Sequence, residues 1–187
     1  MKMLQFYDAE QVDELVWPEN YQQVTEDSPA LAIFTDFRTH VPLVIDSSVR
    51  ALDAEQHMFE AHVRLKLVVD KNNAFMGVVA LEDLDKQEIM KKVVQGHKRE
   101  DLRVTDMMRP KQALKVIDYE ELKTAHVSHV IATLQKYGHQ HCLVVDRVNH
   151  QIRGLVSASD IARKLKIAIA VHESPKFTEL YLAAVHR

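Results

Sequence analysis

The sequence is poor in residues that mark several common classes of protein. Its single cysteine, Cys142, excludes an internal disulfide framework and fits a reducing compartment. Because Cys142 lies in an apolar stretch, we interpret it as a core residue. Four glycines and five prolines in 187 residues argue against a low-complexity chain. A formal charge of −3 and a pI of about 6.4 provide no basic excess, so we expect no nucleic acid partner.

Long apolar runs are also absent from the sequence. No apolar stretch approaches the roughly 20 residues that cross a bilayer. Residues 1–10 lack the basic start and apolar centre of a signal peptide. We therefore expect a cytoplasmic protein without a membrane partner. Hydrophobic residues make up 47% of the chain, which is enough for a substantial core.

The most informative stretch is 154–161, Gly-Leu-Val-Ser-Ala-Ser-Asp-Ile. Leu155 and Val156 are typical of a strand, and Ser157 followed by Asp160 is typical of a capped helix start. Such a start presents a hydroxyl, a carboxylate and free N–H groups at one point, which suits the ribose and phosphate of a nucleotide. An ordinary capped helix after a strand is the simpler interpretation of these eight residues alone.

The unit around this stretch occurs twice in the chain. In each copy an apolar strand ends in Asp, a polar turn follows, and a second strand leads into a helix. The corresponding positions are Gly77 and Gly154, Ala80 and Ser157, and Asp83 and Asp160. An internal repeat of this kind predicts a duplicated architecture.

These residues resemble the CBS domain, paired as in a Bateman module. The family pattern is a strand ending in Val-Asp, a turn, and Gly-hydrophobic-x-Thr/Ser-x-x-Asp opening a helix. Residues 105–108 resemble the segment that leads into the second repeat, 116–118 its first strand and 120–137 its helix. Residues 32–36 occupy the corresponding position before the first repeat. The resemblance implies an α/β (α+β) fold of two repeats, each a small sheet with flanking helices, packed as a pseudo-two-fold pair.

The resemblance also implies how the chain is divided. We predict an N-terminal arm over 1–29, a first CBS repeat over 30–96, a second over 102–168 and a C-terminal helical tail over 169–187. A charged linker that begins with glycine separates the repeats.

Local patterns predict further elements. Residues 41–46 predict the first strand, and one of the two serines that follow is expected to cap the next helix. Residues 82–94 predict another helix. The second repeat has four extra residues between its first two strands, about one helical turn, so we expect a longer helix there. Gly138 is well placed to end it.

The resemblance implies one ligand cleft per repeat. In the family, the Thr/Ser hydroxyl contacts phosphate, the Asp accepts hydrogen bonds from the ribose, and strand residues contact adenine. Ser157 and Asp160 retain both polar groups in the second repeat. The adenine side is expected to be formed by Leu114, Lys115, His139, Gln140 and His141.

The first repeat is expected to hold a weaker second site. It keeps Asp83, but Ala80 has no hydroxyl, and Glu82 adds an anion near the expected phosphate position. We therefore predict one good site and not two.

Other chemistry has little support in the sequence. Among eleven histidines, His126 and His129 are three residues apart, but no third ligand completes a metal site. The sequence contains no Walker-type loop, no G-x-S-x-G and no H-E-x-x-H. We therefore predict a protein that is not an enzyme and that uses neither a metal nor a catalytic cofactor.

The sequence favours a regulatory module that binds an adenine nucleotide and acts on an unknown partner protein. AMP, ADP and ATP are the expected ligands, with NAD and S-adenosylmethionine as further candidates. Apolar residues at 161, 165, 167 and 169 favour a homodimer. The alternative is a ligand-independent dimeric scaffold.

Overall fold

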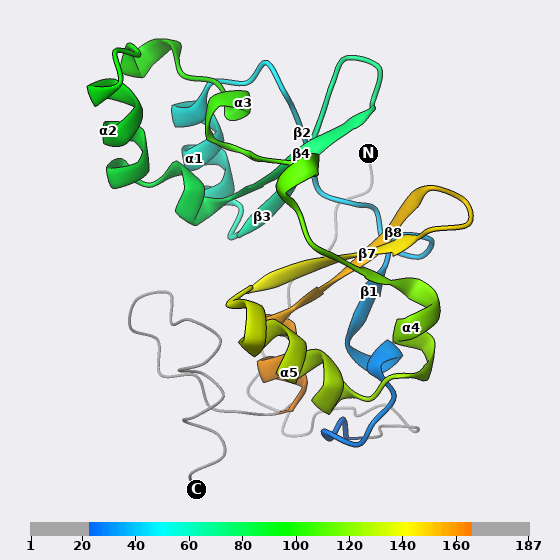
Figure 1. The fold of residues 1–187 in the computed structure, drawn as a ribbon. Helices are drawn as coiled ribbons and strands as arrows, with labels where there is room; N and C mark the ends of the chain where they lie inside the picture. Colours follow the sequence, from blue (N-terminus) through cyan, green and yellow to red (C-terminus); the bar gives the residue numbers. More distant parts are fainter. Residues whose placement is uncertain (1–22, 166–187) are drawn as a thin grey trace, which may run out of the picture.

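The structure is a computed structural model that describes residues 23–165. It is a mixed α+β fold with two small sheets and flanking helices, which confirms the predicted class. Figure 1 shows α1 (Ala51–Glu60), α2 (Lys86–Val94) and α3 (Val104–Met107) gathered beside the first sheet. The predicted C-terminal tail, 169–187, lies outside the described residues, as does most of the predicted arm.

The first sheet has the strand order β2-β3-β4-β5. Strands β2 and β3 are parallel, and the other neighbours are antiparallel. Its strands are β2 (Val44–Asp46), β3 (Leu65–Val69), β4 (Phe75–Ala80) and β5 (Arg109–Pro110). A 3-10 turn, η2 (Leu81–Leu84), connects β4 to the region of α2.

The second sheet repeats this design with the order β1-β8-β7-β6. Its strands are β1 (Phe34–Asp36), β6 (Val116–Asp118), β7 (His141–Asp146) and β8 (Gln151–Ser157). Its helices are α4 (Tyr119–Thr124), α5 (Val127–Tyr137) and α6 (Ala158–Lys164), and α4 and α5 lie beside the lower sheet in Figure 1. The remaining 3-10 turns are η1 (Ala30–Ile33), η3 (Arg99–Asp101) and η4 (Lys111–Ala113).

Each sheet takes its last strand from the segment that leads into the other repeat. We call 28–36 and 102–110 the lead-in segments. β1 of the first pairs with β8, and β5 of the second pairs with β4. Each sheet therefore contains strands from both predicted repeats, 30–96 and 102–168. These limits describe the duplication in the sequence and stay a prediction.

Backbone hydrogen bonds anchor both lead-in segments in the same way. Ala51 N donates to Leu102 O (2.8 Å). The equivalent bond in the other half runs from Val127 N to Ser28 O (2.9 Å). Each bond joins the first residue of a helix to the opposite lead-in segment, which confirms a pseudo-two-fold arrangement at the level of single residues.

An ion pair strengthens the contact of β1 with β8. Arg153 donates from Nε to Asp36 Oδ1 (2.8 Å) and from Nη2 to Asp36 Oδ2 (2.6 Å). The guanidinium also lies 4.3 Å from the centre of the Tyr119 ring. Hydrogen bonding from Arg153 lowers the pKa of Asp36 to about 2, so the carboxylate is charged at neutral pH.

The prediction of one long helix over 120–137 was wrong. The four extra residues build a separate short helix, α4, and α5 has 11 residues against 10 in α1. The chain is extended at Ala125 because Ala125 O accepts a hydrogen bond from Ala30 N (2.9 Å) in the lead-in segment. Tertiary pairing therefore interrupts a sequence whose apolar spacing suits a continuous helix.

Of three further local predictions, two need correction and one is confirmed. Neither serine after β2 caps α1, because the N-cap residue is Arg50 and the Ser48 hydroxyl and N–H both donate to Asp46 Oδ1 (2.5 and 2.7 Å). The predicted helix over 82–94 is η2 followed by α2, with Asp85 as the N-cap of α2. Gly138 ends α5 in the left-handed conformation (φ 65°), as predicted.

The hydrophobic core of residues 23–165 has three parts. One cluster packs the helices against each sheet, and a smaller cluster centred on Leu67, Val78 and Leu143 lies where the sheets face each other. Cys142 is buried in the cluster of the second sheet, as predicted for a core residue. The third cluster therefore forms the apolar contact between the two halves.

Two strand glycines permit the lead-in strands to approach. A Cβ atom built on Gly154 would lie 2.1 Å from Thr35 O, and one on Gly77 would lie 2.3 Å from Arg109 O. Both contacts are with backbone of the lead-in strands, β1 and β5. The repeated glycine is therefore required by strand exchange.

We predict that Gly154→Ala destabilises the protein by about 3 kcal/mol, the upper part of the range for overpacking, because β1 must move away from β8. Urea unfolding followed by circular dichroism measures the free energy. Gly96→Ala is the control, since nothing lies within 4 Å of its added methyl and only its positive φ opposes the change, by about 1–2 kcal/mol. If Gly154→Ala lowers the free energy of unfolding by no more than Gly96→Ala does, close contact between β1 and β8 is not the reason for the glycine.

Candidate functional site

One cleft, with a volume of about 550 Å³, lies between the two halves of the molecule. This volume is within the usual range of about 300–1,000 Å³ for small-molecule sites. Its polar lining comes from the first repeat and from the start of β7, the end of β8 and α6 of the second. The polar residues are Thr35, His40, His62, Arg64, His141, Ser157, Ser159, Asp160 and Arg163. We call this space the Asp160 cleft.

Ser157 and Asp160 both line this cleft, but they do not form the predicted helix cap. Ser157 is the N-cap residue of α6, yet its hydroxyl lies 2.8 Å from the hydroxyl of Ser159. Asp160 Oδ1 accepts from Arg163 Nη2 (2.6 Å). The motif therefore presents hydroxyls, a carboxylate and a guanidinium to the cleft.

The corresponding carboxylate of the first repeat is used internally. Asp83 Oδ2 accepts from Ala80 N (2.8 Å) and from Arg109 Nε (3.2 Å). Arg109 also lies 3.8 Å from Glu82. Because the same oxygen of Asp83 already receives two donors, the two repeats have equivalent sequences but different chemistry at this position.

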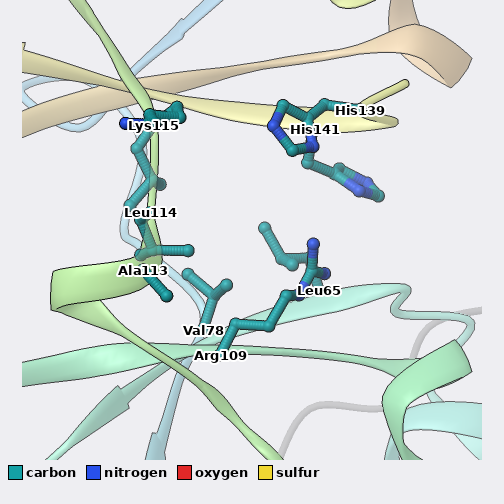
Figure 2. Close-up of a pocket in the computed structure, with 9 residues that line it drawn as sticks. Leu65, Val78, Arg109, Ala113, Leu114, Lys115, His139 and His141 are labelled. Carbon is teal, nitrogen blue, oxygen red and sulfur yellow. The ribbon is translucent and has the colours of Figure 1, made fainter. Parts of the chain in front are cut away.

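The residues predicted for the adenine side do not all lie with Ser157 and Asp160. Leu114, Lys115, His139 and His141 line a small cavity of about 60 Å³. In Figure 2 the two histidines and Arg109 lie on opposite sides of this cavity.

Gln140 lies in a further cavity. It and His141 line a space of about 430 Å³ together with Ala80 and Glu82 of the first repeat. We call this space the Ala80 cleft. Of the five residues predicted for the adenine side, His141 alone also lines the Asp160 cleft.

The reason for this redistribution is the facing arrangement of the two repeats. The segment before a central strand lies between the two motifs, so that Arg64 lines both the Asp160 cleft and the Ala80 cleft of its own repeat. The Asp160 cleft therefore receives His62 and Arg64, which precede β3, and sequence reasoning missed both. The internal repeat contains the signal that finds them, because Arg64 corresponds to Gln140. Leu81 N donates to Arg64 O (2.9 Å) just as Ala158 N donates to Gln140 O (2.8 Å).

His141 is the most perturbed histidine at the site. Burial lowers its pKa to about 4, and the positive charges of Arg109 and Arg64 act in the same direction. Asp160 opposes this effect but does not cancel it. The imidazole is therefore neutral at pH 7.

We predict that His141 makes the protein less stable as the pH falls from 6.5 towards 4. In this window the imidazole of His141 is protonated in the unfolded chain but stays neutral in the folded protein. Up to about 3 kcal/mol of the free energy of unfolding is therefore lost by pH 4. Urea unfolding between pH 7 and 4.5 measures the effect. Asp36 hardly interferes above pH 4.5, since its stabilising effect is lost only as the pH falls from its ordinary pKa of 3.8 to its folded-state pKa of about 2.

His141→Leu is the matched variant for this prediction, because Leu65 occupies the equivalent position of the first repeat. The variant is expected to show a flatter dependence of stability on pH. Parallel curves for the variant and the wild type would contradict the assignment.

No metal centre is formed in the described part of the chain. Among residues 23–165, no group of three His, Cys, Asp or Glu side chains is placed to hold an ion. His129 Nδ1 instead accepts from His126 N (3.2 Å), at the start of α5. Across the same residues, no helix is long and apolar enough to cross a membrane.

Comparison with known proteins finds a family match for the second repeat and a similar fold for most of the chain. Residues 104–167 match the family model of the CBS domain. No curated protein matches the chain. The solved structure of CBSX2 in complex with AMP has a TM-score of 0.52 at 21% identity, covering 73% of this chain and 94% of that one.

Two further solved structures are similar. A conserved CBS-domain protein of unknown function from Thermoplasma acidophilum has a TM-score of 0.52 at 19% identity, covering 80% of this chain and 76% of that one. A CBS domain pair in complex with 5′-methylthioadenosine and S-adenosyl-L-methionine has a TM-score of 0.51 at 18% identity, covering 73% and 94%. Residues 104–167 thus match a CBS domain, and the described part of the chain has the fold of solved CBS-domain proteins.

Proposed function

We propose that this protein is a regulatory module that binds an adenine nucleotide in the Asp160 cleft. The observation that carries the proposal is that Ser157, Asp160 and two arginines, Arg64 and Arg163, line one cleft of about 550 Å³. A carboxylate suits the ribose hydroxyls, and hydroxyl and guanidinium groups suit phosphate. Similar folds bind AMP, and S-adenosylmethionine with methylthioadenosine, which supports an adenosine compound here.

The same geometry supports a sensor. The Asp160 cleft takes residues from both repeats, so a bound nucleotide would contact both halves and favour the arrangement in which they are correctly spaced. Such a ligand changes an equilibrium only by its difference in affinity between two states. The readout is proposed to be altered affinity for a partner protein, without catalysis, in the cytoplasm.

A ligand-independent scaffold is the second candidate. It is favoured by the internal use of Asp83 and by exposed apolar side chains such as Phe59 (71% exposed) and Val94 (83% exposed). The homodimer stays a prediction. Of the residues that suggested it, Ile161 is buried within the chain, and positions 167 and 169 lie outside the described residues.

We predict that Asp160→Ala weakens AMP binding by about 1.5–3 kcal/mol, which is a 10- to 150-fold rise in Kd, because hydrogen bonds to a charged acceptor are lost. Isothermal titration calorimetry measures the change. Asp83→Ala is the matched control and is expected to alter Kd less than threefold. Equal losses from the two substitutions would refute a single principal site at Asp160.

We also predict that millimolar AMP, ADP or ATP raises the melting temperature. At a hundredfold excess over Kd the gain is about 2.7 kcal/mol, or roughly 5–10 °C for a chain of this size. Ser157→Ala is expected to reduce the shift without abolishing it, since the other polar groups of the cleft remain.

Ser128→Ala, on α5, is the control for this shift and is expected to leave it unchanged. If no adenine compound changes the melting temperature of the wild type, the scaffold is the better description.

A further inference from the structure

His141 occupies a position that no other residue of the two sites shares. It begins β7 and lies opposite Ser157 in the register with β8. It lines the Asp160 cleft, the Ala80 cleft and the small cavity of Figure 2. Its counterpart in the first repeat, opposite Ala80, is Leu65, which cannot titrate. One side of the pseudo-two-fold pair therefore has a titratable group where the other has a hydrocarbon.

The charges around His141 come from several elements. In the Asp160 cleft they are Arg64, His40, His62, Asp160 and Arg163. In the two other cavities they are Arg109, Lys115, His139, Glu82 and Asp85. Burial is the main reason that the pKa of the imidazole is low, and the positive charges of Arg109 and Arg64 add to it, while Asp160 acts against them. A phosphate placed beside Arg64 offsets this positive charge.

We propose, resting on the function proposed above, that His141 links nucleotide binding in the Asp160 cleft to protons. A bound phosphate favours the imidazolium form, so the complex takes up a proton from solvent onto the free nitrogen of the ring. The added positive charge then attracts the phosphate. Binding of a phosphorylated ligand becomes tighter as the pH falls, whereas an unphosphorylated nucleoside gains nothing.

The size of the effect follows from linkage. The free protein has a His141 pKa of about 4. If the phosphate returns this pKa to its ordinary value of about 6.5, affinity rises about tenfold between pH 7.5 and 5.5. At pH 6 the complex then takes up about 0.7 of a proton more than a protein that lacks the imidazole.

The experiment titrates AMP into the full-length wild type and His141→Leu by calorimetry at pH 7.5, 6.5, 6.0 and 5.5. The quantity of interest is the ratio of the two Kd values at each pH, because protonation of AMP itself affects both proteins equally. The ratio is expected to grow about tenfold from pH 7.5 to 5.5. At pH 6, two buffers of different ionisation enthalpy measure the proton uptake directly. Adenosine is the second probe, and its ratio is expected to stay constant.

Histidines outside the three cavities provide the controls. His150→Asn suits the positive φ of His150 (53°), and with His57→Gln it is expected to keep the wild-type dependence on pH. If His141→Leu does not fold, His141→Gln replaces it. A ratio that does not change with pH, while AMP still binds, overturns this inference alone. Failure of AMP to bind the wild type at every pH overturns the proposed function and this inference with it.

Discussion

The docking of each lead-in strand on the sheet of the other repeat is the constraint on which the rest of the structure depends. It requires a glycine in β4 and in β8, because a methyl group at either position would meet a backbone oxygen. It also breaks the segment before α5, because Ala125 O pairs with Ala30 N. The exchange makes the pair of repeats, and not the single repeat, the unit that forms a cleft.

Once the halves face each other, each cleft combines the motif of one repeat with residues at the central-strand starts of both repeats. The Asp160 cleft accordingly contains Arg64 from the first repeat as well as Ser157 from the second. His141 lies where the clefts adjoin, and burial between arginines makes it a poor base. Neighbouring charges act on this imidazole, since largely buried groups are screened less than exposed ones.

The two repeats have diverged in charge while keeping their backbone geometry. Asp83 accepts hydrogen bonds from Ala80 N and from Arg109. Asp160 instead pairs with the exposed Arg163, which also lines the Asp160 cleft. The pair Asp160–Arg163 is 2.6 Å long, yet exposure of the arginine limits its contribution to stability. The asymmetry supports a single principal ligand site and is also compatible with a module that retains only its scaffold role.

The sequence by itself determined the repeat, the family resemblance, the α+β class and the end of α5 at Gly138, because these depend on local spacing and on residues that permit special backbone conformations. It also identified Ser157 and Asp160 as the polar pair of one motif. Tertiary structure alone decided which residues share a cleft with that pair, since the facing of the repeats brings Arg64 near and takes Lys115 and His139 to another cavity. It likewise decided the break before α5 and the low pKa of His141, because strand exchange and burial act between segments far apart in the chain.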